Sequence, residues 1–409
     1  MAGSTGMLAA LPAHSLTHLD LQHVHGPVHG PAVSAAVSAA LARLTNLQRL
    51  HVALDEASYS CLAGVAQLSR LTWLEFRGTR AKDYEHLRQL LAQPLPLRVL
   101  QLFNLAGFPP LDLSRLTHLQ ELQDRSHVWS YLAVFPPQLQ QLELWGVPSI
   151  ETLSSAMQLQ QLQRLTFVAD VAEPGQLLRL ARLPALTQLS LGYKYWQPAA
   201  AAAATWPELP QLFELSVRLS GLGPSRQAWP AILSGVAAST NLTRLELDTH
   251  RWFVGDDGEG EGANGSWSTP CAKLAGSTNL RDLSILNGAE LLAPGDALAL
   301  TALTGLTRLV LSGAGAGVGD EAATGVAGSC QQLRHLGLAE CNLVSMACLA
   351  NVALLTQLTG LRLEGNSGLT QQGLMLLTGL KRLQNLSMAR SAEVTGEVVE
   401  RFWAAVRRQ

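Results

Sequence analysis

Five histidines between residues 14 and 29 form the densest group of side chains that could bind a metal: His14, His18, His23, His25 and His29. His23 and His25 are separated by one residue, so a strand would place both imidazoles on the same side. Zinc usually takes four ligands that include cysteine or a carboxylate. No cysteine lies near, and Asp20 is the only close acid. We therefore expect no metal site here, although a metal or ligand sensor built on this cluster is the alternative function.

The cysteines match no catalytic or metal-binding motif. There are five, scattered and without paired spacing: Cys61, Cys271, Cys330, Cys341 and Cys348. A cysteine or serine nucleophile needs a base and an orienting acid in one pocket, and no known signature supplies them. We expect reduced, mostly buried thiols, as in a cytosolic or nuclear protein, and no enzyme activity.

A glycine-rich run, GAGAGVGD (313–320), invites comparison with a dinucleotide-binding loop. The spacing fails, because the third required glycine falls on Val318 or on Asp320, depending on the starting glycine. The chain also lacks the Gly-Lys pair of a phosphate-binding P-loop. We predict a flexible turn and no bound cofactor.

Composition narrows the class of partner. Of the 409 residues 29 are basic and 31 acidic, and this balance lacks the positive footprint of a nucleic-acid or anionic-membrane binder. No apolar stretch is long enough to span a membrane, and the N-terminus lacks the basic region of a secretory signal. We expect a protein that is not secreted and lies in the cytoplasm.

A six-residue pattern, L-x-x-L-x-L, recurs along the whole chain and must position any functional side chains. Plain copies are LTHLDL (16–21), LTRLEL (242–247) and LTGLRL (358–363). The mean step is (386 − 19)/14, about 26 residues, which is typical of a leucine-rich repeat. The second leucine marks fifteen repeats: Leu19, Leu50, Leu74, Leu100, Leu122, Leu142, Leu165, Leu189, Leu215, Leu245, Leu283, Leu309, Leu336, Leu361 and Leu386.

The alternation predicts a strand in every repeat, with leucines on one side and variable residues on the other. A single such strand cannot bury its leucines, whereas parallel strands stacked side by side bury a continuous core. We therefore predict an α/β solenoid, a curved horseshoe with a parallel β-sheet on the concave face and helices and irregular turns on the convex face.

Residues 11–390 resemble the leucine-rich-repeat superfamily. The segment 361–383 is similar to the ribonuclease-inhibitor-like and cysteine-containing subclasses, in which an L/I-T-x-x-G-L pattern starts a convex helix; Leu369, Thr370, Gly373 and Leu374 match it. The alanine-rich run 31–44 suits the same helical position. The composition also resembles repeat proteins of green algae.

Four features depart from the regular pattern. The Asn or Cys that follows the strand in this family occurs only as Cys341 and Asn366, and Asp124 stands where a leucine is expected. Residues 254–270 form an acidic, glycine-rich insertion, for which we predict a mobile loop. A second irregular segment, rich in aromatic residues and alanine, lies earlier in the chain, at 193–210.

The extent of the repeats divides the chain into two parts. We expect an array of about fifteen repeats over 1–390 and a C-terminal capping helix over 391–409. Val398, Val399, Phe402 and Val406 recur at helical spacing in that last segment. The short stretch before the first repeat offers only a poor N-terminal cap, which leaves open a longer chain.

The concave face should carry the binding site, because its side chains are not needed for the core. Exposed aromatic residues beside arginines are typical of binding hot spots. Beyond the insertion we expect a small and neutral face. We predict these partner-binding residues: Trp73, Glu75, Arg77, Phe103, Arg125, Glu143, Trp145, Arg164, Tyr193, Arg218, Arg244 and Glu246.

The resulting hypothesis is a non-catalytic scaffold that binds another protein, either as an adaptor or as a structural component. The resemblance implies roles in ubiquitin ligases or in algal cilia, so an axonemal or nuclear location is the alternative to the cytoplasm. A ubiquitin-ligase adaptor would need a docking domain outside these residues or on another chain. The competing function is a ligand or metal sensor that uses the histidine cluster or the acidic loop.

Overall fold

The chain forms two compact units in the computed structural model, and the boundary between them, after Leu189, falls within one strand, β10 (Gln188–Tyr193). The structure describes residues 11–21, 31–53, 59–78, 85–105, 111–125, 133–145, 150–168, 183–193, 211–219, 228–248, 270–288, 292–366, 368–389 and 391–408.

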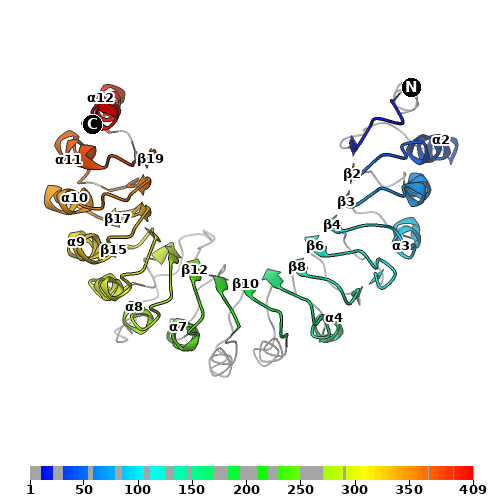
Figure 1. The fold of residues 1–409 in the computed structure, drawn as a ribbon, viewed down its shortest axis with the longest axis horizontal. Helices are drawn as coiled ribbons and strands as arrows, with labels where there is room; N and C mark the ends of the chain where they lie inside the picture. Colours follow the sequence, from blue (N-terminus) through cyan, green and yellow to red (C-terminus); the bar gives the residue numbers. More distant parts are fainter. Residues whose placement is uncertain are drawn as a thin grey trace, which may run out of the picture. The chain divides into compact units, whose positions relative to one another are not determined.

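Parallel strands make up the sheet of the N-terminal unit, one from each repeat, and they are paired in chain order (Figure 1). Leu50 pairs with Leu19 on one side and with Leu74 on the other, and the same register continues to Leu165. The strands of this sheet are β1 (His18–Leu21), β2 (Arg49–Ala53), β3 (Trp73–Arg77), β4 (Val99–Phe103), β6 (Glu121–Arg125), β8 (Gln141–Trp145) and β9 (Arg164–Val168). A separate parallel pair joins β5 (Leu111–Asp112) to β7 (Ala133–Val134).

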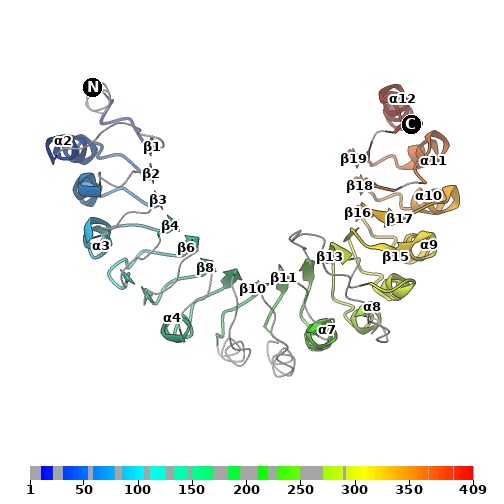
Figure 2. The same cartoon turned by 180° about the vertical axis from the view of Figure 1, so that it is seen from behind.

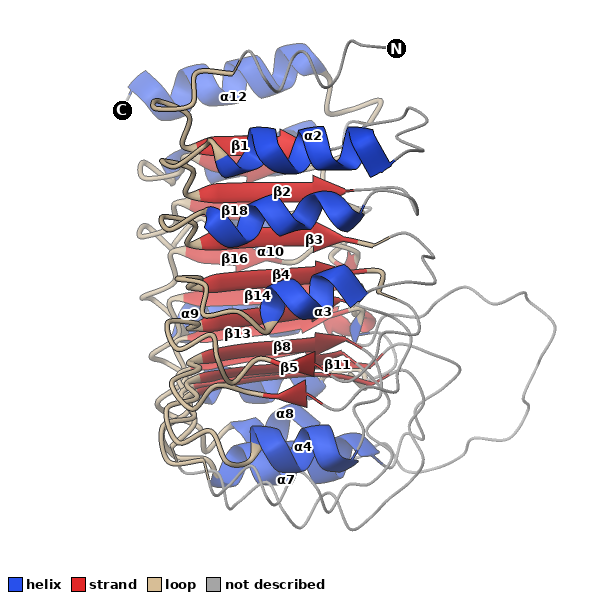
Figure 3. Cartoon of the chain, turned by 90° about the vertical axis from the view of Figure 1, so that its right-hand side faces the viewer, coloured by secondary structure: helices blue, strands red, loops and turns tan. Residues whose placement is uncertain are grey.

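Helices cover one side of this sheet, as Figure 3 shows for α2 and α3. They are α2 (Pro31–Ala42), the 3-10 helix η1 (Tyr59–Gln67), α3 (Glu85–Leu91) and α4 (Ile150–Ala156). The helix predicted over 31–44 is therefore present. Leu87, Leu90 and Leu91 of α3 are buried, so the helix closes the core from behind.

The C-terminal unit repeats this arrangement, with Leu215, Leu245, Leu283 and Leu309 in register on successive strands. Figure 2 shows its strands on one side and its helices on the other. Its strands are β11 (Glu214–Leu219), β12 (Arg244–Asp248), β13 (Asp282–Leu286), β14 (Arg308–Ser312), β16 (His335–Gly337), β18 (Gly360–Arg362) and β19 (Asn385–Ser387). Behind them lie α7 (Ala228–Ala238), α8 (Pro270–Leu274), η5 (Asp296–Ala302), α9 (Asp320–Ser329), α10 (Met346–Val352), α11 (Gln371–Leu376), η6 (Leu377–Gly379) and α12 (Gly396–Arg408).

The repeated leucines form the core of both units, as the alternation predicted. Leu50 and Leu74 are fully buried in the first unit, and Leu245 and Leu283 are fully buried in the second. Asp124 also points inward, between Leu102 and Leu144 of the neighbouring strands, and is only 3% exposed. Parallel strands backed by helices confirm the predicted α/β solenoid.

Threonine in the L-T-x-L pattern has a structural role at the start of the strand. The hydroxyl of Thr307 donates to the carbonyl of Arg281 in the preceding repeat at 3.0 Å, and the backbone N–H of Thr307 donates to the same carbonyl at 2.8 Å. Thr72, Thr187, Thr243 and Thr359 repeat the hydroxyl bond. In these five repeats the threonine thus gives the strand a second link to the repeat before it.

The two residues that match the family's Asn or Cys position bond the turn after the strand. The side-chain amide of Asn366 donates to the carbonyls of Leu338 and Leu363, at 2.6 and 3.0 Å. The thiol of Cys341 donates to the carbonyl of Leu311 at 3.2 Å. Both therefore tie one repeat to the previous one.

The residue just before this position often takes a left-handed conformation, a feature that the sequence pattern did not reveal. Asn104, Asn287, Gly313, Glu340 and Gly365 all have positive φ, and each lies four residues after its marker leucine. Asn and Gly tolerate this region far better than other residues. Glu340 and Gly365 precede Cys341 and Asn366, so the left-handed conformation occurs both with and without a bonding side chain at the next position.

The glycine run 313–320 is not a flexible turn, and that prediction was wrong. Gly315–Gly319 forms strand β15, which pairs with β17 (Cys341–Asn342). Gly319 then precedes α9 as its N-terminal flanking residue. The glycines allow a second, small sheet to form between neighbouring turns.

Helix α11 begins where the L-T-x-x-G-L match predicted. Thr370 flanks its first turn, and the Thr370 hydroxyl accepts a hydrogen bond from the backbone N–H of Gly373 at 3.1 Å. Such a bond satisfies one of the unpaired donors at a helix start. Leu374 is fully buried, so the same motif both starts the helix and packs it.

The last helix, α12, presents an apolar side to the array. Val398, Phe402 and Val406 are buried, and the helix contacts η6 and α11. Trp403 lies beside Phe402, with ring centroids 5.3 Å apart.

Candidate functional site

The sheet face, defined as the side of each sheet that carries the residues between the leucines, presents three rows of side chains in every strand. The rows lie one residue before the marker leucine, one after it and three after it. In the N-terminal unit, register places Arg77 beside Phe103, and Phe103 beside Arg125, in the third row. Side chains that are more than twenty residues apart in sequence thus become direct neighbours.

Four of the predicted residues form one continuous stack in the third row, the aromatic–arginine row: Arg77, Phe103, Arg125 and Trp145. The guanidinium carbon of Arg77 lies 4.9 Å from the centre of the Phe103 ring. That of Arg125 lies 5.6 Å from the Phe103 ring and 5.1 Å from the Trp145 ring. All three distances are within the range of cation–π attraction. Cations and rings therefore alternate along the face.

Two predicted glutamates hold this row from the neighbouring second row. The Nε of Arg77 donates to Glu75 Oε1 at 2.9 Å, and the Nε of Arg125 donates to Glu143 Oε1 at 2.9 Å. The indole N–H of Trp145 donates to the same oxygen of Glu143, at 2.5 Å. Each arginine is thus fixed by one carboxylate and by at least one ring.

Glu75 is more enclosed than an ordinary surface acid, since only 7% of the residue is exposed. Its Oε1 also lies 3.3 Å from Nε2 of His51 on the adjacent strand. His51 was missed in the sequence prediction. The sequence could have predicted this contact, because aligning the marker leucines places His51 directly beside Glu75 on the neighbouring strand.

The remaining predicted residues of this unit lie on the same face but outside the row. Trp73 and Arg164 both occupy the first row, Trp73 half-buried and Arg164 exposed. Arg164 donates to the side-chain oxygen of Gln141 at 3.3 Å. Tyr193 ends β10, and its side chain lies outside the described part of the chain.

Three predicted residues of the C-terminal unit, Arg218, Arg244 and Glu246, form ion pairs with acidic or basic side chains of the same face. Arg218 lies 3.1 Å from Asp248 and 3.6 Å from Glu246. Asp282, which the sequence prediction omitted, lies between Arg244 and Arg308, at 3.6 and 3.5 Å. Alternating charges on successive strands therefore satisfy one another.

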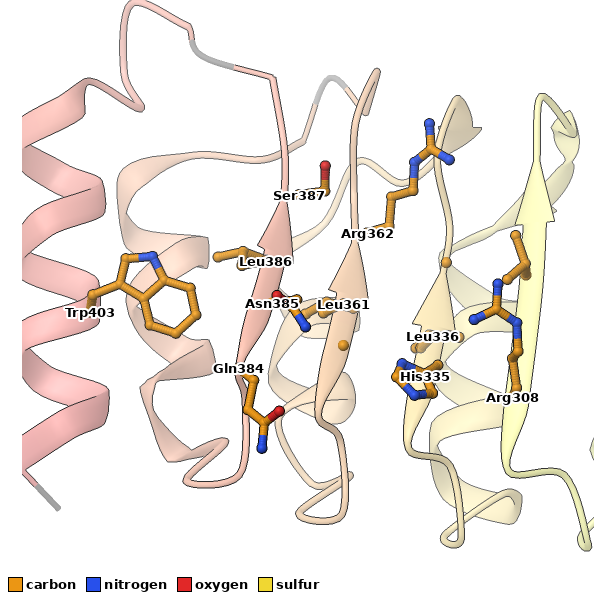
Figure 4. Close-up of a pocket in the computed structure, with 13 residues that line it drawn as sticks. Arg308, His335, Leu336, Leu361, Arg362, Gln384, Asn385, Leu386, Ser387 and Trp403 are labelled. Carbon is orange, nitrogen blue, oxygen red and sulfur yellow. The ribbon is translucent and has the colours of Figure 1, made fainter. Parts of the chain in front are cut away.

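The later strands are not the small, neutral surface expected from sequence. That expectation followed the second and third rows, where Gly337 and Ala339 are indeed small, and overlooked Arg308 and His335 in the first row and Arg362 in the second. These side chains line a depression of about 510 Å³ together with Trp403 of α12 (Figure 4). A pattern restricted to strands could not have included a helix residue.

The described thiols are protected from reaction. Burial raises the pKa of Cys330 to about 11, and burial is also the main cause that raises the pKa of Cys341 and of Cys348 to about 12. A nucleophilic cysteine requires the opposite shift. Cys271, Cys330, Cys341 and Cys348 are all buried, in agreement with the expectation for these four.

Asp296 is a buried acid with an unusual environment on the helix side of the sheet. Its Oδ2 accepts a hydrogen bond from the backbone N–H of Cys271 at 3.1 Å, while its Oδ1 is buried and has no hydrogen-bond partner among the residues that the structure describes. Burial raises the pKa of this carboxyl, against the lowering effect of the Cys271 bonds. Burial, with Asp296 close by, also raises the pKa of the Cys271 thiol well above its ordinary value.

Several sequence predictions fall outside the described residues. They include His23, His25 and His29 of the histidine cluster, residues 254–269 of the acidic insertion, and the segment 194–210; Pro270 begins α8. Within the described part of the chain, no group of three or more His, Cys, Asp or Glu is arranged to hold a metal ion. No helix among those residues is both long and apolar enough to cross a membrane.

Comparisons with known proteins find no matching protein-family model and no matching curated protein. Solved structures do match. An internalin from Listeria monocytogenes is 17% identical with a TM-score of 0.48, over 88% of this chain and 96% of the internalin. The protein of the TLR13–ssRNA13 complex is 17% identical with a TM-score of 0.48, over 85% of this chain and 54% of that one. A leucine-rich-repeat protein from Leptospira interrogans is 14% identical with a TM-score of 0.42, over 95% and 87%.

The fold itself follows from the repeat, since the fifteen marker leucines each lie on a strand and neighbouring leucines are in register wherever their pairing is described. The chain has the leucine-rich-repeat fold.

Proposed function

We propose that this chain is a non-catalytic scaffold that binds another protein on the sheet face of its N-terminal unit. The observation that carries the proposal is the aromatic–arginine row. Phe103 lies between Arg77 and Arg125, and Trp145 packs against Arg125, on a surface that the leucine core does not need. Tryptophan, tyrosine and arginine are the residue types most enriched among binding hot spots.

The contacts within the row support preorganisation for binding. Glu143 holds both Arg125 and Trp145 through one oxygen, so neither long side chain is free to adopt many rotamers. Ordering a flexible side chain at an interface costs about 0.5–1.5 kcal/mol, and a side chain already held in place avoids much of this loss. The row therefore offers flat apolar rings and oriented guanidinium groups at low entropic cost.

The dimensions of the row suit a single element of a partner protein. Four neighbouring strands span three intervals of about 4.8 Å, or roughly 14 Å. An α-helix with its side chains is about 10–12 Å across. Because Glu75 and Glu143 balance Arg77 and Arg125, the complementary surface is an apolar element with mixed polar flanks rather than a polyanion.

We also propose that the chain is of the ribonuclease-inhibitor-like subclass, which the helix start at Thr370 supports. We further propose that α12 caps the C-terminal end of the array, which its packing supports. We propose a cytoplasmic location, with the cilium axoneme or nucleus as alternatives, and a role as adaptor or structural component. Arg218, Arg244 and Glu246 form a charged patch of the C-terminal unit that we propose as a secondary contact.

The test is quantitative affinity capture from a lysate of the source organism, followed by mass spectrometry. Three baits are compared: the wild type, the double variant Phe103→Ala with Trp145→Ala, and Phe213→Ala. Phe213 is a matched control because it is exposed, at 48%, and lies outside the row. We expect a protein that the wild type and the control retain and that the double variant loses by at least about 10-fold.

Thermal melting by circular dichroism must first show that all three baits are folded. Isothermal titration with the identified protein then measures the same difference directly. Equal retention by all three baits, or retention of no protein by the wild type, would contradict binding through this row.

A further inference from the structure

The depression on the sheet face of the C-terminal unit is formed by missing side chains. Gly337 and Gly360 occupy sheet-face positions on β16 and β18. A Cβ at Gly360 would lie 2.6 Å from Nδ1 of His335, and a Cβ at Gly337 would lie 3.1 Å from a methyl group of Val310. The imidazole and the valine therefore rest over the glycine backbones, and the floor is lower here than where other strands place a side chain.

Trp403 provides a wall from a different element. Figure 4 shows it extending from α12 toward Leu386, while Arg362, His335 and Arg308 come from successive strands on the other side. The volume, about 510 Å³, is within the usual range for small-ligand sites. The Trp403 ring thus lies at one end of the depression, beside β19, and the arginines lie on strands toward the other end.

Hydrogen-bond donors dominate the polar lining. Two guanidinium groups, Arg308 and Arg362, and two side-chain amides, Gln384 and Asn385, line the depression, whereas no carboxylate does. The nearest acids are bonded to the arginines: Asp282 to Arg308 at 3.5 Å and Glu364 to Arg362 at 2.7 Å.

The charges around the depression indicate which class of ligand it can bind. The two lining arginines, Arg308 and Arg362, are paired with Asp282 and Glu364, so these four charges balance. Arg244, which lies outside the lining and shares Asp282, adds one positive charge nearby, and this small excess favours a monoanion over a dianionic phosphate. A guanidinium fork fits a carboxylate, and the Trp403 ring fits a flat apolar group.

We propose that this depression is a binding site for a carboxylate attached to an apolar body, either a free carboxylic acid or the C-terminal residue of a peptide. Arg308 and Arg362 bind the carboxylate, and Trp403 stacks on the apolar part. The site lies wholly within the C-terminal unit and does not depend on the function proposed for the aromatic–arginine row. Because the depression is shallow, we expect a Kd on the order of 0.1–1 mM for a small acid.

The experiment measures binding of N-acetylphenylalanine to the full chain by ligand-observed NMR and titration calorimetry. Its uncharged amide is the matched ligand control, and phenyl phosphate tests the preference for a monoanion. A pentapeptide that ends in phenylalanine, with a free or an amidated C-terminus, separates the two sources. We expect both free acids to bind at least about 10-fold more tightly than their amides and than phenyl phosphate.

Three variants test the location of the site. Arg362→Gln should weaken binding of the acid by about 10-fold or more, because it removes one charged fork. Gly360→Val should abolish binding by raising the floor. Arg382→Gln is the control, since Arg382 is an exposed arginine of the same unit that bonds Gln357 outside the depression.

A tighter complex with the free-terminus peptide than with the small acid identifies a chain terminus as the source, and equal affinity identifies a small molecule. Both results support the site. Equal binding of acid and amide, tighter binding of phenyl phosphate, equal effects of Arg362→Gln and Arg382→Gln, or no binding at about 10 mM acid, well above the expected Kd, would overturn it.

Discussion

Individual residues in this protein take their chemistry from the repeat position they occupy. Glutamate is an ordinary surface residue in a helix, yet Glu75 is 7% exposed because arginine and histidine from its own and the adjacent strand close around it. Asp124 and Asp296 are likewise buried, at 3% and 5% exposure. The sheet-face acid Glu75 lies 2.9 Å from Arg77 and 3.3 Å from His51, whereas Asp296 is held by backbone and thiol groups.

Asp296 should make stability depend on pH. Its pKa is raised by burial, so between its unfolded and folded pKa values the folded state binds more protons than the unfolded state. The free energy of unfolding therefore falls as pH rises through the folded pKa, and the stabilising contribution is complete only below the unfolded pKa. Asp296→Asn removes this titration. We expect the stability of the variant relative to the wild type to increase from pH 4.5 to pH 7.

Urea unfolding of both proteins at several pH values measures this difference. The Asn side chain keeps the oxygen that accepts from the Cys271 backbone, so the variant should still fold. Parallel stability profiles across the whole pH range would show that Asp296 does not titrate in this way.

Turns, strands and helices of neighbouring repeats are linked by bonds that recur at fixed positions. In several repeats a threonine hydroxyl bonds the preceding repeat just before the strand, and in several a left-handed residue follows the strand. At the turn after β18, Gly365 has φ of 71°, and an added Cβ would lie 2.7 Å from the side chain of Glu340 and 3.3 Å from its backbone. Neither problem exists at Gly379, which has open space and no positive φ.

We therefore predict that Gly365→Ala lowers the free energy of unfolding by roughly 1–3 kcal/mol, through left-handed strain and crowding. Gly379→Ala, outside any such turn, should change it by less than about 1 kcal/mol. Chemical unfolding of both variants at one temperature gives the comparison. Equal midpoints for the two variants would mean that the turn relaxes without cost.

At the scale of the whole molecule, each repeat depends chiefly on its neighbours. The contacts of β14 in the sheet are with β13 and β16, and no central core joins distant repeats among the described elements. The stability of such an array is approximately a sum of repeat terms and nearest-neighbour terms. A destabilising substitution in one repeat should therefore affect mainly that repeat and its immediate neighbours.

Leu309→Ala tests this property. Leu309 is fully buried on β14, and a buried Leu→Ala change costs roughly 2–5 kcal/mol. We expect hydrogen exchange to accelerate in β13, β14 and β16 and to remain unchanged in β2, β3 and β4 of the N-terminal unit. Uniform acceleration across both units would show that they unfold as one cooperative body.

Much of the fold could be read from sequence because the information is periodic and local. Leu74 and Leu100 had to share a face and a register, since a slip of one residue would expose the leucines of an entire strand. The same register placed Arg77, Phe103 and Arg125 side by side, so the composition of the row was predictable. Its geometry was not, because the choice of Glu143 as the shared acceptor of Arg125 and Trp145 depends on rotamers.

The sequence alone determined the repeat, the strand positions, the helix start at Thr370 and the candidates on the sheet face, because alternation and capping act over a few residues. Only the tertiary structure decided that 315–319 pairs as a strand, that Asp296 is buried against Cys271, and that Trp403 of the last helix lines the same depression as Arg308, Arg362, Gly337 and Gly360. Those contacts join elements that no short-range pattern connects, and they form only when the packing of one repeat on the next brings the elements together.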